Sequence, residues 1–257
     1  MASGPAAPPA QAPPHPPRRG HIPGRVYLAI VLILVLAAGL VTYIAVRHRP
    51  QDQLPTARPA GLPASVSTAL ADLMQLSSVP AKAAPGFTLT DQAGRTLSLA
   101  SFRGHAVVLE FMDPHCTDIC PIVSQEFVGA YRDLGAAASR VVFLAVNVNP
   151  YHRTVADMAA YSAEQGLNTL PSWHFFTGQL AALRAVWGSF DVQVDAPGPD
   201  ADVIHTSTVY FIDPSGHERF VAVPMDDHAA SGTAYLPAGQ LASWGRGIAL
   251  VARQLVG

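Results

Sequence analysis

The chain has 257 residues, of which 49% are apolar, with 16 Lys or Arg against 18 Asp or Glu. This apolar content excludes a protein that is disordered throughout. The charge is unevenly distributed, because residues 1–84 carry seven basic and two acidic side chains whereas residues 85–257 carry nine and sixteen. Since the larger part is acidic and would repel phosphate groups, we expect no nucleic-acid partner.

Residues 26–46 read VYLAIVLILVLAAGLVTYIAV and contain no charged side chain. At a rise of about 1.5 Å per residue, such a helix is about 31 Å long, which matches the hydrocarbon layer of a bilayer. The stretch is longer than the apolar region of a cleaved signal peptide, and Arg47 and Arg49 follow it. We therefore predict an uncleaved transmembrane helix that anchors the chain to the membrane in a single pass.

The segments on either side of this helix differ in composition from the rest of the chain. Residues 1–25 are rich in proline and alanine and predict a disordered tail. Residues 47–84 are interpreted as a juxtamembrane linker, in which 64–77 space apolar residues at helical intervals and predict a short helix. Residues 85–257 are predicted to form one domain, which is long enough to bury a core.

The predicted elements of this domain alternate between strands and helices. It opens with a hairpin around a turn at 91–94, where apolar and polar residues alternate on both sides. Short apolar runs then predict strands at 105–111, 140–148, 172–176, 206–212 and 218–223, and helical spacing predicts helices at 121–134, 154–165, 178–188 and 237–256. This order indicates an α/β domain with a partly parallel sheet.

The two cysteines of the chain, Cys116 and Cys120, follow the strand predicted at 105–111. Sites form at the carboxyl ends of such strands, and a helix N-terminus lowers the pKa of a nearby thiol. If Pro121 opens the next helix, Cys120 is its cap, and the two thiols can either close a disulfide or bind a soft metal. Two cysteines cannot complete a tetrahedral zinc site, whereas Cu(I) accepts a low coordination number with one further ligand.

Several histidines are candidates for that further ligand. His205 is predicted to open the strand that continues over 206–212, beside an acidic loop at 191–204, and His115 precedes Cys116. Four other histidines of the domain are interpreted as ordinary surface or core-edge residues. They are His152, His174, His217 and His228.

Two motifs resemble those of a known family. Cys116-Thr-Asp-Ile-Cys120-Pro121, preceded by His115, resembles the C-x-x-x-C-P motif of the Sco/SenC family. His205 and the strand that ends in Ile212-Asp213-Pro214-Ser215-Gly216 resemble its second motif. The resemblance covers about residues 85–257 together with the single anchor. It implies a thioredoxin-like fold, with a central mixed β-sheet flanked by helices, and copper bound by Cys116, Cys120 and His205.

The resemblance also implies a role in assembling the copper A centre of cytochrome c oxidase, whose copper subunit would be the client. The match departs from the family's pattern at several positions. Thr117 replaces the usual Pro after the first Cys. Asn149 and Arg153 stand where the family's D-P-x-x-D-T-P stretch has its two aspartates. These changes predict altered partner recognition and a divergent branch of the family.

Three functions follow from these residues. The first is a membrane-anchored copper chaperone, a metal carrier rather than an enzyme. The second is a thiol–disulfide oxidoreductase that uses Cys116 and Cys120 as its catalytic pair, with a thiol–disulfide reductase as partner. The third is a redox or copper sensor, whose acidic loop at 191–204 either docks a basic partner or is merely solvated.

The chemistry of the site also decides the expected orientation. A thiol pair of this kind suits an oxidising, extracytoplasmic compartment, so we expect the N-terminus in the cytoplasm and the domain outside. Fifteen Arg against one Lys indicate a bacterial source. The predicted location is therefore the bacterial cell membrane.

Overall fold

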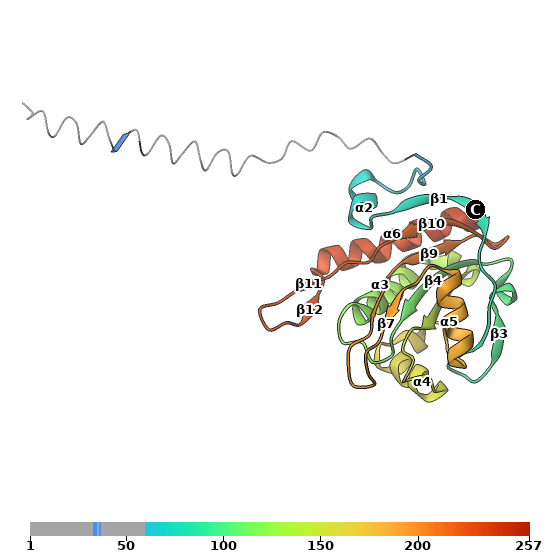
Figure 1. The fold of residues 1–257 in the computed structure, drawn as a ribbon. Coiled ribbons are helices and arrows are strands. Elements are labelled where there is room, and N and C mark those ends of the chain that lie inside the picture. The colour runs from blue at the N-terminus through green and yellow to red at the C-terminus, as the bar shows by residue number, and fades with distance from the viewer. Residues whose placement is uncertain (1–32, 35, 37–59) are drawn as a thin grey trace, which may run out of the picture. The chain divides into compact units, whose positions relative to one another are not determined.

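The computed structural model describes residues 33, 34, 36 and 60–257 (Figure 1). The chain divides into two compact units, Met1–Pro55 and Thr56–Gly257. The predicted tail and most of the helix predicted at 26–46 lie outside the described residues. The three described residues of that helix, Ile33, Leu34 and Leu36, are helical and between 63% and 65% exposed. Over the part of the chain that is described, no helix has the length and apolar character needed to cross a membrane.

The second unit is built on a six-stranded sheet with the order β1-β10-β9-β4-β5-β6. Strands β4, β5 and β6 run parallel, and the other pairs are antiparallel, so the sheet is mixed as predicted. The strands are β1 (Ser77–Ala83), β4 (Ala106–Met112), β5 (Val141–Asn147), β6 (Trp173–Phe176), β9 (Val209–Ile212) and β10 (His217–Ala222).

Three small hairpins and five helices surround this sheet. The hairpins are β2 (Thr88–Thr90) with β3 (Thr96–Ser98), β7 (Val194–Asp195) with β8 (Ile204–His205), and β11 (Asp227–His228) with β12 (Ala234–Tyr235). The helices are α2 (Thr68–Leu73), α3 (Ile119–Leu134), α4 (Val155–Glu164), α5 (Leu180–Ser189) and α6 (Ala238–Val256). Single 3-10 turns occur at Leu99–Phe102, Gly135–Arg140 and Leu167–Thr169.

The sheet is buried on both faces. Helices α2, α3, α4 and α6 pack on one face, and α5 with the β2–β3 hairpin packs on the other. Successive side chains of β4 therefore enter different cores, with Val108 and Met112 in the first and Leu109 and Phe111 in the second. Burial on both faces explains why β4 and β5 are almost continuously apolar in sequence.

The fold begins inside the segment that the sequence predicted as a linker. Strand β1 forms the edge of the sheet by pairing with β10, and α2 lies just before it. Val66 and Met74, which flank α2, are fully buried. The described part of residues 47–84 is therefore packed against the domain from about residue 60 onward.

Candidate metal centre

The predicted site lies at the carboxyl end of β4, where its chain leaves the sheet for α3. Because β4 and β5 are parallel, the loops that follow them meet at the same edge of the sheet. A cavity of about 500 Å³ opens there. Cys116 and His205 both line it, together with Asp113, Thr117, Asp118, Ile119, Asp202, Val203, Ile204, His228 and Gly232.

The loop that carries Cys116 is held by the carboxylate and carbonyl groups of Asp113. The backbone N–H of His115 donates to Asp113 Oδ1 at 2.9 Å, and that of Cys116 donates to the Asp113 carbonyl at 3.2 Å. The N–H of Asp118 in turn donates to Cys116 Sγ at 3.4 Å. Cys116 is partly buried, whereas Cys120 is only 2% exposed, and both are free thiols.

The predicted start of the next helix at Pro121 is wrong. Helix α3 begins at Ile119, so Cys120 lies within its first turn and is not its cap. Pro121 is tolerated at the third helical position because the first four N–H groups of a helix have no partner within it. Cys116 nevertheless stays on the preceding loop, as expected, and its thiol is free to approach that of Cys120.

The two thiols differ in acidity because they share one hydrogen bond. The Cys120 thiol donates to Cys116, which lowers the pKa of Cys116, and the N–H groups of Cys120 and Asp118 lower it further. The same hydrogen bond, together with burial, raises the pKa of Cys120 well above its usual range. Cys116 is therefore the thiol that ionises first, and Cys120 is the one that keeps its proton.

The prediction that His205 opens the strand over 206–212 is wrong. His205 belongs to the separate two-residue strand β8, which pairs with β7, and β9 begins only at Val209. The intervening residues leave the strand because Ser207 Oγ and the Thr208 N–H donate to the buried carboxyl group of Glu110 at 3.0 and 3.1 Å. Glu110 thus fixes the segment on which His205 lies.

The orientation and the favoured neutral form of the His205 imidazole suit a metal ligand. Its Nδ1–H donates to the Thr206 carbonyl at 3.0 Å, which leaves the lone pair on Nε2. Burial lowers the pKa of His205, so the neutral form is favoured. His205 shares the cavity with Cys116, but among the described residues the ligand atoms of Cys116, Cys120 and His205 are not all within 4.8 Å of one another.

The stretch that departs from the family's pattern lies directly behind this loop. Asn149 is 2% exposed, and its Nδ2 donates to Asp113 Oδ1 at 2.9 Å. Its Oδ1 accepts the N–H groups of Tyr151 and His152 at 2.9 and 3.0 Å. Asn149 therefore joins the loop after β5 to the loop after β4, with the carboxylate supplied by Asp113. Asp113 was not predicted as a site residue, although an acidic residue just after a buried strand is a signal for a site.

The β11–β12 hairpin adds a second missed feature at the mouth of the cavity. His228, interpreted from sequence as an ordinary histidine, has its Nε2 3.0 Å from Asp118 Oδ1 and 3.6 Å from Asp226 Oδ2. Burial raises the pKa of Asp226, and the nearby charge of Asp118 raises it further. No local pattern in the sequence brings these residues together, because Asp226 and His228 come from a hairpin about 110 residues after Asp118.

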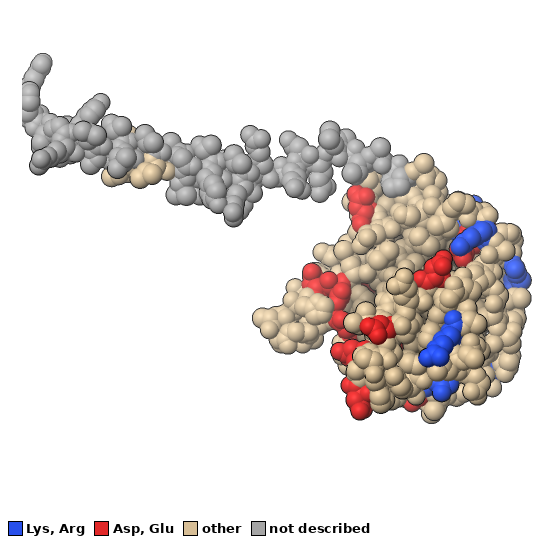
Figure 2. All heavy atoms as spheres, in the orientation of Figure 1, with Lys and Arg blue, Asp and Glu red and all other residues tan. Residues whose placement is uncertain are grey.

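Acidic side chains surround the cavity. Figure 2 shows them gathered on the side of the domain that carries β7 and the β11–β12 hairpin, while basic side chains lie mainly on another side. The exposed carboxylates of this acidic rim are Asp118 and Asp202, which line the cavity, and Asp195, Asp200 and Asp227, which lie within the β7–β8 and β11–β12 hairpins. The rim therefore includes the acidic loop predicted at 191–204.

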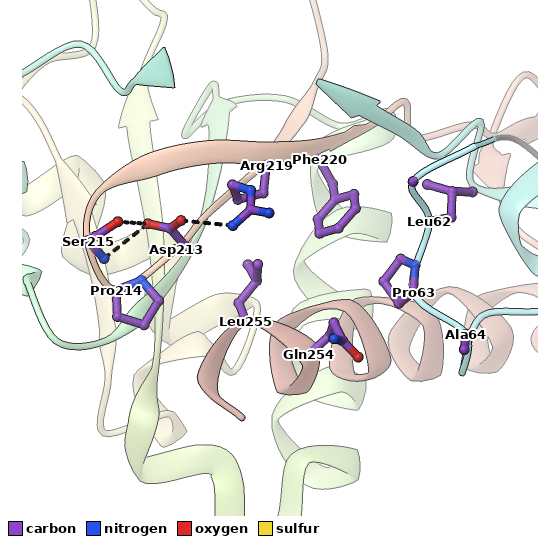
Figure 3. A pocket seen from close by; sticks show the side chains of 11 residues that line it. Leu62, Pro63, Ala64, Asp213, Pro214, Ser215, Arg219, Phe220, Gln254 and Leu255 are labelled. Atoms are coloured by element: carbon purple, nitrogen blue, oxygen red, sulfur yellow. Dashed lines mark hydrogen bonds and ion pairs between the residues drawn. The ribbon is translucent and has the colours of Figure 1, made fainter. Parts of the chain in front are cut away.

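A somewhat larger cavity, of about 580 Å³, lies elsewhere, between the β9–β10 turn, the end of α6 and residues 61–64 (Figure 3). Its charged groups already pair with each other, since Arg219 donates to Asp213 Oδ2 at 3.2 Å and Ser215 Oγ donates to Asp213 Oδ1 at 2.6 Å. It is lined by no thiol or imidazole. The cavity at Cys116 is the one that carries reactive groups.

Comparison with known proteins places the fold in a family. The SCO1/SenC family model matches residues 77–231. The mitochondrial SCO2 homologue of Bos taurus is 34% identical over 136 residues, which are 51% of this chain and 50% of that protein. The SCO1 homologue of Bacillus subtilis is 27% identical over 132 residues, which are 51% of this chain and 68% of that protein. The chain thus spans about half the length of the mitochondrial relative.

Solved structures agree with this match. ScoI of Bradyrhizobium japonicum, a structure with copper bound, has a TM-score of 0.52 and 25% identity, and covers 68% of this chain and 99% of its own. A SCO1/SenC family lipoprotein from Bacillus anthracis has a TM-score of 0.54 at 19% identity, and covers 70% of this chain and 98% of its own. The mixed sheet with helices on its faces is the thioredoxin-like α/β fold that the motifs implied. The chain belongs to the SCO1/SenC family.

Proposed function

We propose that this protein is a membrane-anchored copper chaperone that carries Cu(I) on Cys116, Cys120 and His205. The observation that carries the proposal is the cavity in which the low-pKa thiol of Cys116, hydrogen-bonded to Cys120, shares a wall with the neutral imidazole of His205. Family membership and the copper bound in the Bradyrhizobium ScoI structure support it. The client is the copper subunit of cytochrome c oxidase, to which the ion passes by ligand exchange.

The donor set fits this cargo. Two thiolates and one imidazole are soft ligands that suit Cu(I), and three ligands satisfy its low coordination number. Both thiols must lose their protons when the ion binds, so affinity falls as the pH is lowered. The raised pKa of Cys120 makes its proton the harder of the two for the ion to displace.

Copper binding on this proposal requires His205 to approach the thiols. His205 lies on a two-residue strand paired only with β7, and Thr206 contacts the same hairpin through a 3.0 Å hydrogen bond to the Gln193 carbonyl. A hairpin with so few backbone hydrogen bonds can shift while the main sheet stays in place. The acidic rim beside it would dock a basic surface of the client and raise the association rate.

The anchor and the orientation complete the proposal. Residues 26–46 form the membrane span, the Pro/Ala-rich tail lies in the cytoplasm, and the copper domain lies on the extracytoplasmic side of a bacterial cell membrane. The exposed, apolar and helical Ile33, Leu34 and Leu36 support the span. In this arrangement the domain remains close to a membrane-bound oxidase.

The test is anaerobic Cu(I) binding to the full-length chain, measured by competition with a chelator of known affinity. Wild type is expected to bind one Cu(I) tightly, and Cys116→Ala, Cys120→Ala and His205→Ala are each expected to bind at least about tenfold more weakly, because each removes one ligand. His217→Ala is the matched control, since His217 lies on β10 and bonds Ser215 outside the cavity. Full affinity in His205→Ala would exclude the proposed ligand set.

The second candidate is a thiol–disulfide oxidoreductase. The observation that favours it is the unequal acidity of the thiols, since an attacking thiolate and a protonated resolving thiol have this arrangement. This function predicts that the protein turns over a dithiol substrate. The turnover should require both cysteines and should be unchanged in His205→Ala. The same set of variants therefore separates the two functions.

A further inference from the structure

A second group of possible metal ligands lies beside the thiols and uses none of the three residues proposed for Cu(I). The ligand atoms of His115, His152 and Asp157 all lie within 4.8 Å of one another. They come from three places in the fold, namely the loop after β4, the loop after β5 and the first turn of α4. The cluster thus forms only because the parallel strands β4 and β5 bring their two loops together.

The side chains of this cluster are oriented by neighbouring groups. The rings of His115 and His152 stack with their centroids 3.7 Å apart and their planes 26° apart. His152 Nε2–H donates to the Pro199 carbonyl at 3.1 Å, which leaves the lone pair on Nδ1. Metal-binding histidines are commonly oriented in this way, by a hydrogen bond from the other ring nitrogen to a carbonyl.

Asp157 is held in place by the start of its own helix. Its Oδ2 accepts the N–H of Thr154 at 2.9 Å, while its own N–H donates to Thr154 Oγ1 at 3.0 Å. This reciprocal capping box keeps the carboxylate on the side of α4 that faces the two imidazoles. A carboxylate with two oxygens can accept such a bond and still bind an ion.

The donor chemistry selects a different ion from that of the cysteine site. Two imidazoles and one carboxylate suit borderline divalent ions such as Zn(II) and Cu(II), whereas thiolates suit Cu(I). We propose that His115, His152 and Asp157 form a second, divalent transition-metal site next to the thiol pair. Three protein ligands leave a further coordination position for water or another group.

The other cluster of this kind among the described residues, Asp118 with Asp226 and His228, is a weaker candidate. Its imidazole Nε2 already lies 3.0 Å from Asp118 Oδ1, and the side chains of Asp118 and His228 are about half exposed. Its groups therefore satisfy one another without an ion. It serves instead as the internal control for the test.

The experiment uses the full-length chain with both cysteines replaced, Cys116→Ser and Cys120→Ser, so that no thiol competes for the ion. Zn(II) is titrated calorimetrically into this background and into the same background with His152→Ala, Asp157→Asn or His228→Ala. The background is expected to bind one Zn(II) at the cluster. His152→Ala and Asp157→Asn are expected to weaken that binding at least about tenfold, and His228→Ala to leave it unchanged.

Cu(II) provides a spectroscopic readout of the same ligands. The nitrogen hyperfine pattern in its electron paramagnetic resonance spectrum should show two imidazoles in the background and one in His152→Ala. Asp157→Asn retains an acceptor for the Thr154 N–H and hence the capping box, so it tests the site even if His152→Ala fails to fold. The proposal is overturned if Zn(II) affinity is unchanged in both variants, or if it is lost with His228→Ala instead.

The outcome is independent of the proposed copper function. Zn(II) binding in the background without cysteines does not involve the Cu(I) ligands. Loss of Cu(I) binding in His205→Ala likewise says nothing about His152. Failure of either proposal therefore leaves the other intact.

Discussion

Glu110 is a buried carboxyl group in the middle of β4, only 1% exposed and close to the thiols. Its Oε1 accepts hydrogen bonds from Ser207 and Thr208, whereas its Oε2 has no partner in the described structure. Burial raises the pKa of Glu110 to about 8. Glu126 of α3 lies on the same face of the sheet, and burial raises its pKa well above the usual range too. Glu110 is therefore mostly neutral at pH 7 and does not add a full negative charge beside Cys120.

This burial predicts how stability depends on pH. Between the ordinary carboxyl pKa of 4.5 and the folded value of about 8, the folded chain keeps a proton on Glu110 that the unfolded chain has released. The free energy of unfolding should therefore fall as the pH rises through this range. Glu110→Gln keeps an acceptor for Ser207 and Thr208 but does not titrate, so its stability should fall less steeply between pH 5 and pH 8. Denaturant unfolding at several pH values measures both slopes.

The control for this experiment is Glu164→Gln, which changes an exposed carboxylate on α4. It should retain the slope of the wild type. Identical slopes for Glu110→Gln and the wild type would mean that Glu110 is ionised in the folded chain. The double variant with Glu126→Gln should be flatter still.

At the scale of elements, the second family motif separates into two parts with different roles. His205 lies on β8 at the cavity, whereas Asp213–Gly216 form the turn between β9 and β10. Asp213 Oδ1 accepts the N–H groups of Ser215 and His217, both at 3.0 Å, and Gly216 has a φ of +79°. A Cβ atom on Gly216 would collide with the guanidinium group of Arg103. The D-P-x-G part of the motif thus stabilises the turn and does not line the Cys116 cavity.

Gly216→Ala should therefore lower stability without changing Cu(I) stoichiometry. A left-handed φ and the displaced Arg103 together should cost about 1–3 kcal/mol of unfolding free energy. Gly86→Ala is the matched control, because Gly86 has no positive φ and open space around its Cβ position. Chemical denaturation and the Cu(I) competition assay measure the two effects. Loss of copper binding by folded Gly216→Ala would contradict this division of the motif.

Strong apolar patterns predicted most of the elements, and weak ones were missed. Strands β4 and β5 are buried on both faces, so their sequence alone indicates them. Strand β1 was not predicted, because nearly all its side chains are exposed and it joins the sheet through backbone hydrogen bonds to β10. The break before β9 was missed for a different reason. It depends on Glu110, which lies about 100 residues earlier in the chain.

The candidate site shows the same limit. Metal chemistry was indicated directly by the sequence, through the spacing of Cys116 and Cys120 and the presence of a histidine at position 205. His152, by contrast, looked like an ordinary histidine, because only the pairing of β4 with β5 stacks its ring on His115. Local sequence specifies the reactive residues, but the topology of the sheet decides which of them meet.

At the scale of the whole molecule, the acidic and basic side chains are unevenly distributed along the chain. The acidic excess belongs to residues 85–257, and acidic side chains gather on the side of the domain that carries β7 and the β11–β12 hairpin (Figure 2). The basic residues of 1–84 fall mainly on both sides of the predicted span. These basic residues therefore do not decide the orientation, and the outward orientation that we expect rests on the thiol chemistry of the cavity.

Orientation can be measured with Cys116 itself. After brief reduction, a membrane-impermeant maleimide should label the full-length chain in intact spheroplasts, because Cys116 is the more accessible and more acidic thiol. Cys116→Ser should abolish this labelling, since Cys120 is buried. Labelling that appears only after the membrane is permeabilised would place the domain in the cytoplasm.

The hydrogen bond between Asn149 and Asp113 has a thermodynamic consequence for the two proposed sites. It connects the loop of His152 with the loop of His115 and Cys116, so an ion that orders one loop alters the free energy of ordering the other. Such coupling is reciprocal: whatever factor a divalent ion imposes on Cu(I) affinity, Cu(I) must impose on the affinity for that ion. A single buried amide would then make the loading of one metal depend on the supply of another.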